Sequence, residues 1–131
     1  MKDFTQFMEL RPAKAISTYE RLECVNGEFI SIQAGEDMFC LPKKNLPIEN
    51  YTHFEIYANI TQKIAEKYDL AFEDSWLYAD VPKQTVASII AEFGGLKKEK
   101  ELIDRISEEK ELLSDVMTIS SIKASSDKNR F

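Results

Sequence analysis

The chain has 131 residues, of which 44% are hydrophobic and 31% are charged, and its formal net charge is −6. This length suits one compact domain that buries a core of its own. The acidic balance disfavours nonspecific binding to phosphate backbones, so we expect no direct binding to nucleic acid. Because no run approaches the ~20 apolar residues of a membrane span and residues 1–10 lack the apolar core of a signal peptide, we expect no membrane contact and a cytoplasmic location.

The N-terminal part of the chain predicts a helix followed by a β-hairpin. Residues 2–10 place four apolar side chains at helical spacing, and Pro12 follows shortly after them. Residues 19–34 contain two partly alternating apolar runs on either side of Asn26-Gly27. This dipeptide accommodates the positive φ angles of a type I′ turn, so we expect a tight hairpin here.

Two more strands and a loop are expected in the middle of the chain. Residues 38–41 form a short apolar run that Pro42 must end or leave at a sheet edge. Residues 42–50 show neither helical nor strand periodicity and predict an exposed loop. Residues 51–58 alternate between two sets of side chains, which predicts a strand with one buried face.

Helices dominate the remainder of the chain. Residues 59–69 combine an N-cap at Asn59 with an apolar stripe and predict a helix. Residues 75–81 predict a strand, and residues 82–93 predict a helix that starts at a proline and stops at a pair of glycines. Residues 96–117 are highly charged and predict one long helix, because their apolar residues recur at helical spacing.

These segments together predict an α+β fold in a single domain that covers residues 1–119. Its antiparallel sheet has four or five strands packed by helices, and the long charged helix at residues 96–117 is its C-terminal element. Residues 120–131 contain four serines and four charged residues, which predicts a disordered tail.

One pair of residues is a candidate for catalysis. A cysteine nucleophile needs a neighbouring base, and His53 is the only histidine, so Cys40 with His53 would give a small cysteine- and histidine-dependent enzyme. The alternative is that Cys40 is a small buried hydrophobic residue and His53 a polar surface residue. Two cysteines and one histidine do not supply the paired ligands of a zinc site, and no glycine-rich turn leads from a strand into a helix. We therefore expect neither a metal nor a cofactor.

A second group of candidates is aromatic and indicates a protein-binding surface. Its members on the expected strands are Tyr51, Tyr57, Trp76 and Tyr78, and Lys43 and His53 lie close to them in the sequence. Aromatic rings exposed together on a sheet give a partner a rigid contact area. Packing of these rings into the core is the alternative.

The long helix has two kinds of surface. Its apolar positions pack against the chain's own sheet, or against a partner protein, or against a second copy in a homodimer through residues 96–117. Its candidate binding carboxylates are Glu101, Asp104, Glu108, Glu109 and Glu111. Such a row presents negative charge where a partner would otherwise hold the phosphates of a nucleic acid, and a solvated helix face is the alternative.

Four short segments occur in a recognisable order. They are ISIQA at Ile30–Ala34, FCLPKKNLP at Phe39–Pro47, YTHFEI at Tyr51–Ile56 and LYADVPKQTVASIIAEFGG at Leu77–Gly95. Their order resembles that of a group of small phage- and prophage-encoded proteins of unknown function. Leu41 and Lys43 replace a small polar residue and an arginine of that pattern, and lysine lacks the two-pronged hydrogen bonding of arginine. Residues 96–131 have no counterpart in the pattern.

The resemblance implies an α+β domain and a mobile-element setting, and it implies no reaction. We therefore expect a non-enzymatic accessory protein of a phage or another mobile element. It would bind a host or defence-system protein in the host cytoplasm, for example as an anti-CRISPR-type inhibitor. The small enzyme that uses Cys40 and His53, and a homodimeric structural or assembly protein, are the alternatives.

Overall fold

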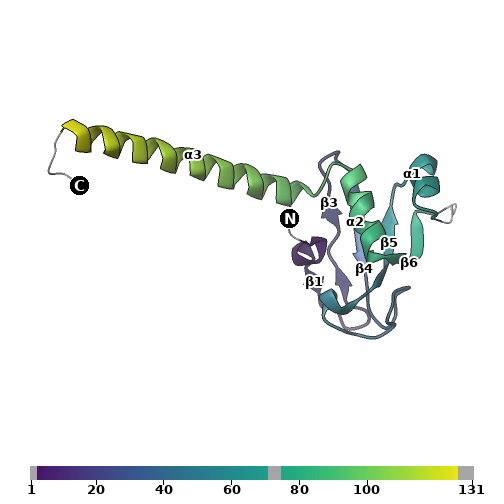
Figure 1. Cartoon of the computed structure of the whole chain (residues 1–131). Helices are drawn as coiled ribbons and strands as arrows, with labels where there is room; N and C mark the ends of the chain where they lie inside the picture. The colour runs from purple at the N-terminus through teal and green to yellow at the C-terminus, as the bar shows by residue number, and fades with distance from the viewer. Residues whose placement is uncertain (1–2, 71–74, 127–131) are drawn as a thin grey trace. The chain divides into compact units, whose positions relative to one another are not determined.

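The computed structural model describes residues 3–70 and 75–126, with side chains as far as Leu113. The chain divides into two compact units, residues 1–98 and residues 99–131. The first unit contains the described strands and the core, and it has the predicted α+β fold with an antiparallel sheet (Figure 1). The second unit is formed by most of one long helix.

Four antiparallel strands form the main sheet, in the order β3-β4-β5-β6. They are β3 (Leu22–Glu23), β4 (Phe29–Gln33), β5 (His53–Ala58) and β6 (Leu77–Pro82). A separate two-stranded sheet, which the sequence did not predict, pairs β1 (Leu10–Arg11) with β2 (Thr18–Tyr19). The four strands of the main sheet lie within the range of four or five that we expected.

One face of the main sheet supplies the centre of the core. Its buried residues on β4 and β5 are Ile30, Ile32, Phe54, Ile56 and Ala58. They occupy alternate positions because successive side chains of a strand point to opposite faces. The helix α2 (Lys83–Glu92) adds Val86, Ile89 and Ile90 to the same core, at helical spacing. Tyr57 lies on the opposite face of the sheet and is exposed.

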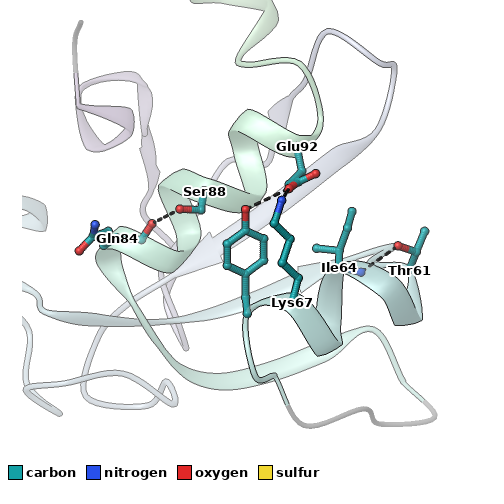
Figure 2. A network of polar contacts seen from close by, with 7 residues as sticks. Thr61, Ile64, Lys67, Gln84, Ser88 and Glu92 are labelled. Atoms are coloured by element: carbon teal, nitrogen blue, oxygen red, sulfur yellow. Dashed lines mark hydrogen bonds and ion pairs between the residues drawn. The ribbon is translucent and has the colours of Figure 1, made fainter.

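The helix α1 (Gln62–Lys67) begins later than predicted. Its N-cap is Thr61, whose Oγ1 accepts a hydrogen bond of 3.3 Å from the backbone N–H three residues later (Figure 2). The predicted N-cap at Asn59 is therefore wrong by two residues, because the threonine hydroxyl satisfies one of the free N–H groups of the first turn. The predicted loop at residues 42–50 contains a short 3-10 helix, η2 (Ile48–Asn50).

A polar contact joins the end of α1 to the end of α2. Lys67 Nζ lies 2.6 Å from Glu92 Oε1, and the Tyr68 hydroxyl donates to the same oxygen at 3.0 Å (Figure 2). The hydrogen bond from Lys67 lowers the pKa of the Glu92 carboxyl. The two helices are thus tied together at the surface as well as through the core.

The turn of the β3–β4 hairpin closes the C-terminal end of α2. The backbone N–H groups of Val25 and Asn26 donate to the carbonyls of Gly95 and Phe93, at 2.9 and 3.0 Å. Gly94 has a φ of +86°, and a Cβ atom there would lie 3.2 Å from the Cβ of Val25. Both the backbone conformation and the close contact therefore require glycine at this position.

The hairpin is present, but its predicted type I′ turn is wrong. Gly27 has a φ of +89°, whereas Asn26 does not have a positive φ. The Gly27 N–H donates to the Cys24 carbonyl at 3.0 Å, and the Cys24 N–H donates to the Glu28 carbonyl at 2.8 Å. The loop therefore has three residues and ends on a left-handed glycine, which is the next most common hairpin geometry.

The predicted N-terminal helix is also shorter than expected. A 3-10 helix, η1 (Phe4–Phe7), begins after Asp3. The Asp3 carboxylate accepts a hydrogen bond of 3.0 Å from the Thr5 N–H. This 3-10 helix replaces the helix predicted over residues 2–10, because Leu10 belongs to β1 and pairs with Tyr19. Pairing with a distant segment overrides the local helical spacing.

The strand predicted at residues 38–41 is absent. The Met38 N–H donates to the Gly35 carbonyl, and the Cys40 N–H donates to the Met38 carbonyl, so this segment is folded into turns. A single bridge between Leu41 and His53 is the only strand-like pairing described here. Met38 and Cys40 are buried while Phe39 and Leu41 are exposed, so the apolar run alternates in burial without forming a ladder of backbone hydrogen bonds.

The long helix α3 (Lys97–Ser126) extends beyond the predicted range of residues 96–117. No glycine or proline follows Gly95 in the sequence, so no residue breaks the helix. Residues 120–126 of the predicted disordered tail have a helical backbone, and residues 127–131 lie outside the described residues. In the part of the chain that the structure describes, no helix is long and apolar enough to cross a membrane.

Candidate functional site

The structure places the Cys40 thiol in the core. The side chain is 1% exposed, and Sγ donates to the Gly35 carbonyl at 3.1 Å and accepts from the Gly35 N–H at 3.3 Å. A second carbonyl, that of Pro42, lies 3.5 Å from Sγ, so the thiol is surrounded by backbone groups of its own segment. A nucleophile for an external substrate needs an accessible sulfur atom, which Cys40 does not have.

His53 does not serve as a base for Cys40. Its backbone pairs with Leu41, and its Nδ1 lies 2.8 Å from the Thr52 hydroxyl. Leu41, whose backbone pairs with His53, is exposed, whereas the neighbouring Cys40 is buried. Among the described residues, no hydrogen bond joins Cys40 to His53, so the sequence-predicted pair lies close in the fold without forming a dyad.

The predicted aromatic group divides between core and surface. Tyr51 and Tyr78 are buried, so they belong to the core. The Tyr51 hydroxyl accepts from the Leu46 N–H at 2.7 Å and donates to the Lys44 carbonyl, which holds the neighbouring loop. The strand predicted over residues 51–58 begins only at His53, so Tyr51 precedes β5 and does not follow its alternation.

Tyr57 and Trp76 remain on the surface and contact each other. They are 50% and 49% exposed, and their ring centroids lie 5.7 Å apart. Phe29 is also exposed and lies on the same sheet face, because Ser31 of the same strand is directly opposite Tyr57. The Arg21 guanidinium lies 3.9 Å from the centroid of the Phe29 ring. We call Phe29, Tyr57 and Trp76 the aromatic surface.

The sequence analysis missed Phe29 and Arg21. Phe29 could have been identified from the alternation of its strand. Ile30 and Ile32 are buried on one face, so Phe29 falls on the opposite face. Lys43, which we predicted as a binding residue, lies 5.4 Å from the centroid of the exposed Phe39 ring. Its ammonium group is therefore placed on an aromatic side chain at the surface.

The predicted acidic residues line the first half of α3. Glu101, Asp104, Glu108, Glu109 and Glu111 are all exposed. Lys100 Nζ lies 2.9 Å from Asp104 Oδ2, a pair of residues one helical turn apart. Both side chains are more than half exposed, so solvent screens this pair and it contributes little to the stability of the helix.

Large aliphatic side chains of α3 are exposed beside these carboxylates. The exposed fractions are 51% for Ile103, 42% for Ile106, 65% for Leu112 and 62% for Leu113, and Leu102 is half-buried. We call Leu102, Ile103, Ile106 and Leu113 the apolar seam. The seam is accessible to a partner, whereas each large aliphatic residue of the core is almost fully buried.

The described residues therefore offer two exposed apolar surfaces for contact with another molecule, the seam and the aromatic surface. Within the described ranges no group of three or more histidine, cysteine or acidic side chains is arranged to hold a metal ion. No protein-family model, no curated protein and no solved structure matches this chain.

Proposed function

We propose that this chain is a non-enzymatic protein-binding module that docks its partner through α3. The observation that carries this proposal is the exposure of the apolar seam and of Leu112 on one long helix. A helix that presents aliphatic side chains at helical spacing, with charges between them, is the usual form of a helix that packs against another protein.

Energetics support docking at the seam. Full burial of a leucine or isoleucine side chain contributes about 1.5–3 kcal/mol relative to full exposure. The three exposed side chains of the seam, Ile103, Ile106 and Leu113, therefore leave on the order of a few kcal/mol for an association that covers them. That free energy is large enough to offset part of the entropy that association costs.

The partner that we propose is a host or defence-system protein. This assignment is supported by the resemblance to phage and prophage proteins and by the small acidic chain, which suits an inhibitor that occupies a surface and performs no reaction. An anti-CRISPR-type inhibitor in the host cytoplasm is one protein of this class.

The acidic side of α3 gives a second way to bind, in which carboxylates occupy a partner's nucleic-acid channel. The two modes use different residues and are therefore separable. Replacing Glu108, Glu109 and Glu111 by glutamine removes three negative charges and keeps the size of the side chains. Replacing Ile106 by glutamate places a charge in the seam and keeps the other carboxylates.

The test is affinity capture from a bacterial lysate with active defence systems, followed by mass spectrometry. We expect the unaltered chain to capture a stoichiometric protein, Ile106→Glu to lose it, and the triple glutamine variant to retain it. Ser107→Glu is the matched control, because it adds the same charge one residue along and outside the seam. Undiminished capture by Ile106→Glu would overturn the seam as the docking surface, and loss of capture only in the triple variant would establish charge mimicry instead.

A further inference from the structure

The strand β6 lies at one edge of the main sheet. In the order β3-β4-β5-β6 it has one neighbour, β5, and no other described strand pairs with it. The Ala58 N–H of β5 donates to the Trp76 carbonyl at 3.1 Å. In an antiparallel ladder, residues that bond to the neighbouring strand alternate with residues that do not. Leu77, which pairs with Tyr57 in the next position, therefore points its backbone N–H and carbonyl away from β5.

A second residue of β6 is also left without a backbone partner on β5. The register shifts between Phe54 and Ile56, so that Ala79 and Asp80 occupy the space of one residue of β5. The Asp80 N–H donates to a loop carbonyl at 3.0 Å. No described backbone hydrogen bond outside the strand ladder involves Ala79 or Leu77. These two residues therefore leave hydrogen-bonding groups at the edge of the sheet for another strand.

A cavity of about 560 Å³ follows this edge. All six residues of β6 line it, and so do residues 68–70, which follow α1. A cavity over one face of a strand is lined mainly by every second residue, so lining by consecutive residues places it beside the strand. Six strand residues extend over about 20 Å. Pro82 has no N–H, so the part of the edge that can pair ends before it.

The charged side chains that line the cavity are all acidic. They are Asp69 and Asp80, which are exposed and form no ion pair with any described residue. Lys67 and Lys83, which adjoin the lining segments in the sequence, pair with other carboxylates, and Lys43 lies over an aromatic ring. The two aspartates therefore favour an occupant with positive charge.

We propose that the edge of β6 binds an extended segment of a partner protein by strand addition, with a lysine or arginine of that segment beside Asp69 and Asp80. Backbone hydrogen bonds to Leu77 and Ala79 provide affinity in this mode, and side-chain contacts provide specificity. The surface belongs to the first unit and contains no residue of α3, so this inference goes beyond the proposed function.

Peptide titration tests the charge of the occupant. The probe is a blocked heptapeptide of alternating valine and lysine, added to the full chain, and the readout is the emission of Trp76, which adjoins Leu77 in the sequence. We expect Asp69→Asn and Asp80→Asn each to raise the dissociation constant about threefold, because each removes one exposed attraction. Asparagine tolerates the positive φ of both positions, +53° and +50°.

Two controls accompany the titration. Asp104→Asn makes the same change on α3 and should leave the dissociation constant unaltered. A heptapeptide with glutamate in place of lysine should bind at least about tenfold more weakly, because like charges then meet. Equal affinity of the two heptapeptides would overturn the assignment of a basic segment.

Hydrogen exchange tests strand addition itself. Saturation with the valine–lysine heptapeptide should slow exchange of the Leu77 and Ala79 amides, because the added strand accepts hydrogen bonds from them. Leu77→Pro should abolish binding and keep the fold, since it removes an N–H that points away from β5. Leu77→Val keeps that N–H and should bind normally. Unchanged exchange at both amides in the saturated complex would overturn strand addition and leave a site for a basic side chain alone.

The outcomes separate this inference from the proposed function. Ile106→Glu, which tests the apolar seam, should leave the affinity for the heptapeptide unaltered. Loss of heptapeptide binding in Ile106→Glu would place the peptide on the seam and overturn the assignment to β6. If the unaltered chain does not bind the heptapeptide at millimolar concentration, the inference fails while the seam of α3 still stands as a docking surface.

Discussion

Cys40 is the candidate nucleophile of this chain, and its surroundings bear on whether the chain has a reactive centre. Its thiol contacts the backbone of Gly35 as both donor and acceptor, and it is almost completely buried. Cys24 is buried too, and burial raises the pKa of its thiol to about 11. A fraction on the order of one in a thousand of that thiol is ionised at pH 8.

Thiol labelling at native pH tests this environment. We expect both cysteines of the native chain to react with a disulfide reagent far more slowly than in the unfolded chain, at a rate that rises with added denaturant. The physical reason is that the sulfur atoms must first become accessible through opening of the fold. Rapid native labelling of Cys40 below pH 8, with loss of that rate in His53→Ala, would instead reveal an activated thiolate and revive the enzyme alternative.

At the scale of elements, β2 is attached to the sheet by one side chain. Gln33 Oε1 accepts from the Tyr19 N–H at 2.8 Å, and Gln33 Nε2 donates to the Tyr19 carbonyl at 2.7 Å. The side-chain amide of Gln33 thus bonds to the backbone of Tyr19 as the backbone of a neighbouring strand would. Gln33 is itself buried, so these hydrogen bonds are shielded from water.

Gln33→Leu removes both hydrogen bonds and keeps a side chain of similar size. We expect a loss of about 1–3 kcal/mol in the free energy of unfolding, because the backbone groups of Tyr19 lose their partners. Hydrogen exchange of the Tyr19 amide should accelerate as well. Ser31→Ala is the control, since Ser31 accepts a further hydrogen bond from Gln33 Nε2 and no described hydrogen bond joins it to Tyr19. Equal effects of the two substitutions would show that the amide does not hold β2.

The same elements show how far the sequence predicts this fold. The periodicity of residues 51–58 and 82–93 identified β5 and α2, because each of these elements buries one face. The aromatic and apolar residues at positions 76–78 identified β6. The pair β1 and β2 escaped prediction, since each strand has two residues and its attachment depends on Gln33, which is distant in the sequence. The charged residues and the spacing of the apolar residues identified the first half of α3. Whether another surface covers the apolar seam depends on contacts with residues distant in the sequence, which local periodicity does not reveal.

The aromatic group could be only partly assigned for a related reason. Residue type identified Tyr51, Tyr57, Trp76 and Tyr78 as one group, but two of them are buried and two are exposed. The division depends on where β5 begins and on an irregularity in the pairing of β5 with β6, which shifts the register between Phe54 and Ile56. Neither feature has a signal in the local periodicity.

At the scale of the whole molecule, the core and α3 separate at one point in the chain. The last residue of the core is Leu96, which is buried and bridges to Cys24. Lys97 adds an ion pair of 3.3 Å with Glu23. Every described core residue therefore precedes residue 98, where the first unit ends.

A chain that ends at Lys98 should fold on its own. We expect its free energy of unfolding to differ by less than about 1 kcal/mol from that of the full chain measured at low concentration, because the described core lies within it. A chain that ends at Gly95 is the control and should be about 2–4 kcal/mol less stable, because it lacks the buried Leu96 side chain. If the chain that ends at Lys98 fails to fold, α3 contributes to the core in a way that the burial of its residues does not indicate.

The position of Trp76 makes the first unit separately observable by spectroscopy. It is the one tryptophan of the sequence, and it lies half exposed against Tyr57, so the intrinsic fluorescence of the chain originates at the aromatic surface. Far-ultraviolet circular dichroism at the helical band is weighted towards α3, which contributes 30 helical residues against 16 in α1 and α2. Emission and dichroism therefore follow two different parts of the same molecule, and a difference between their transitions would show that the sheet and the long helix melt independently.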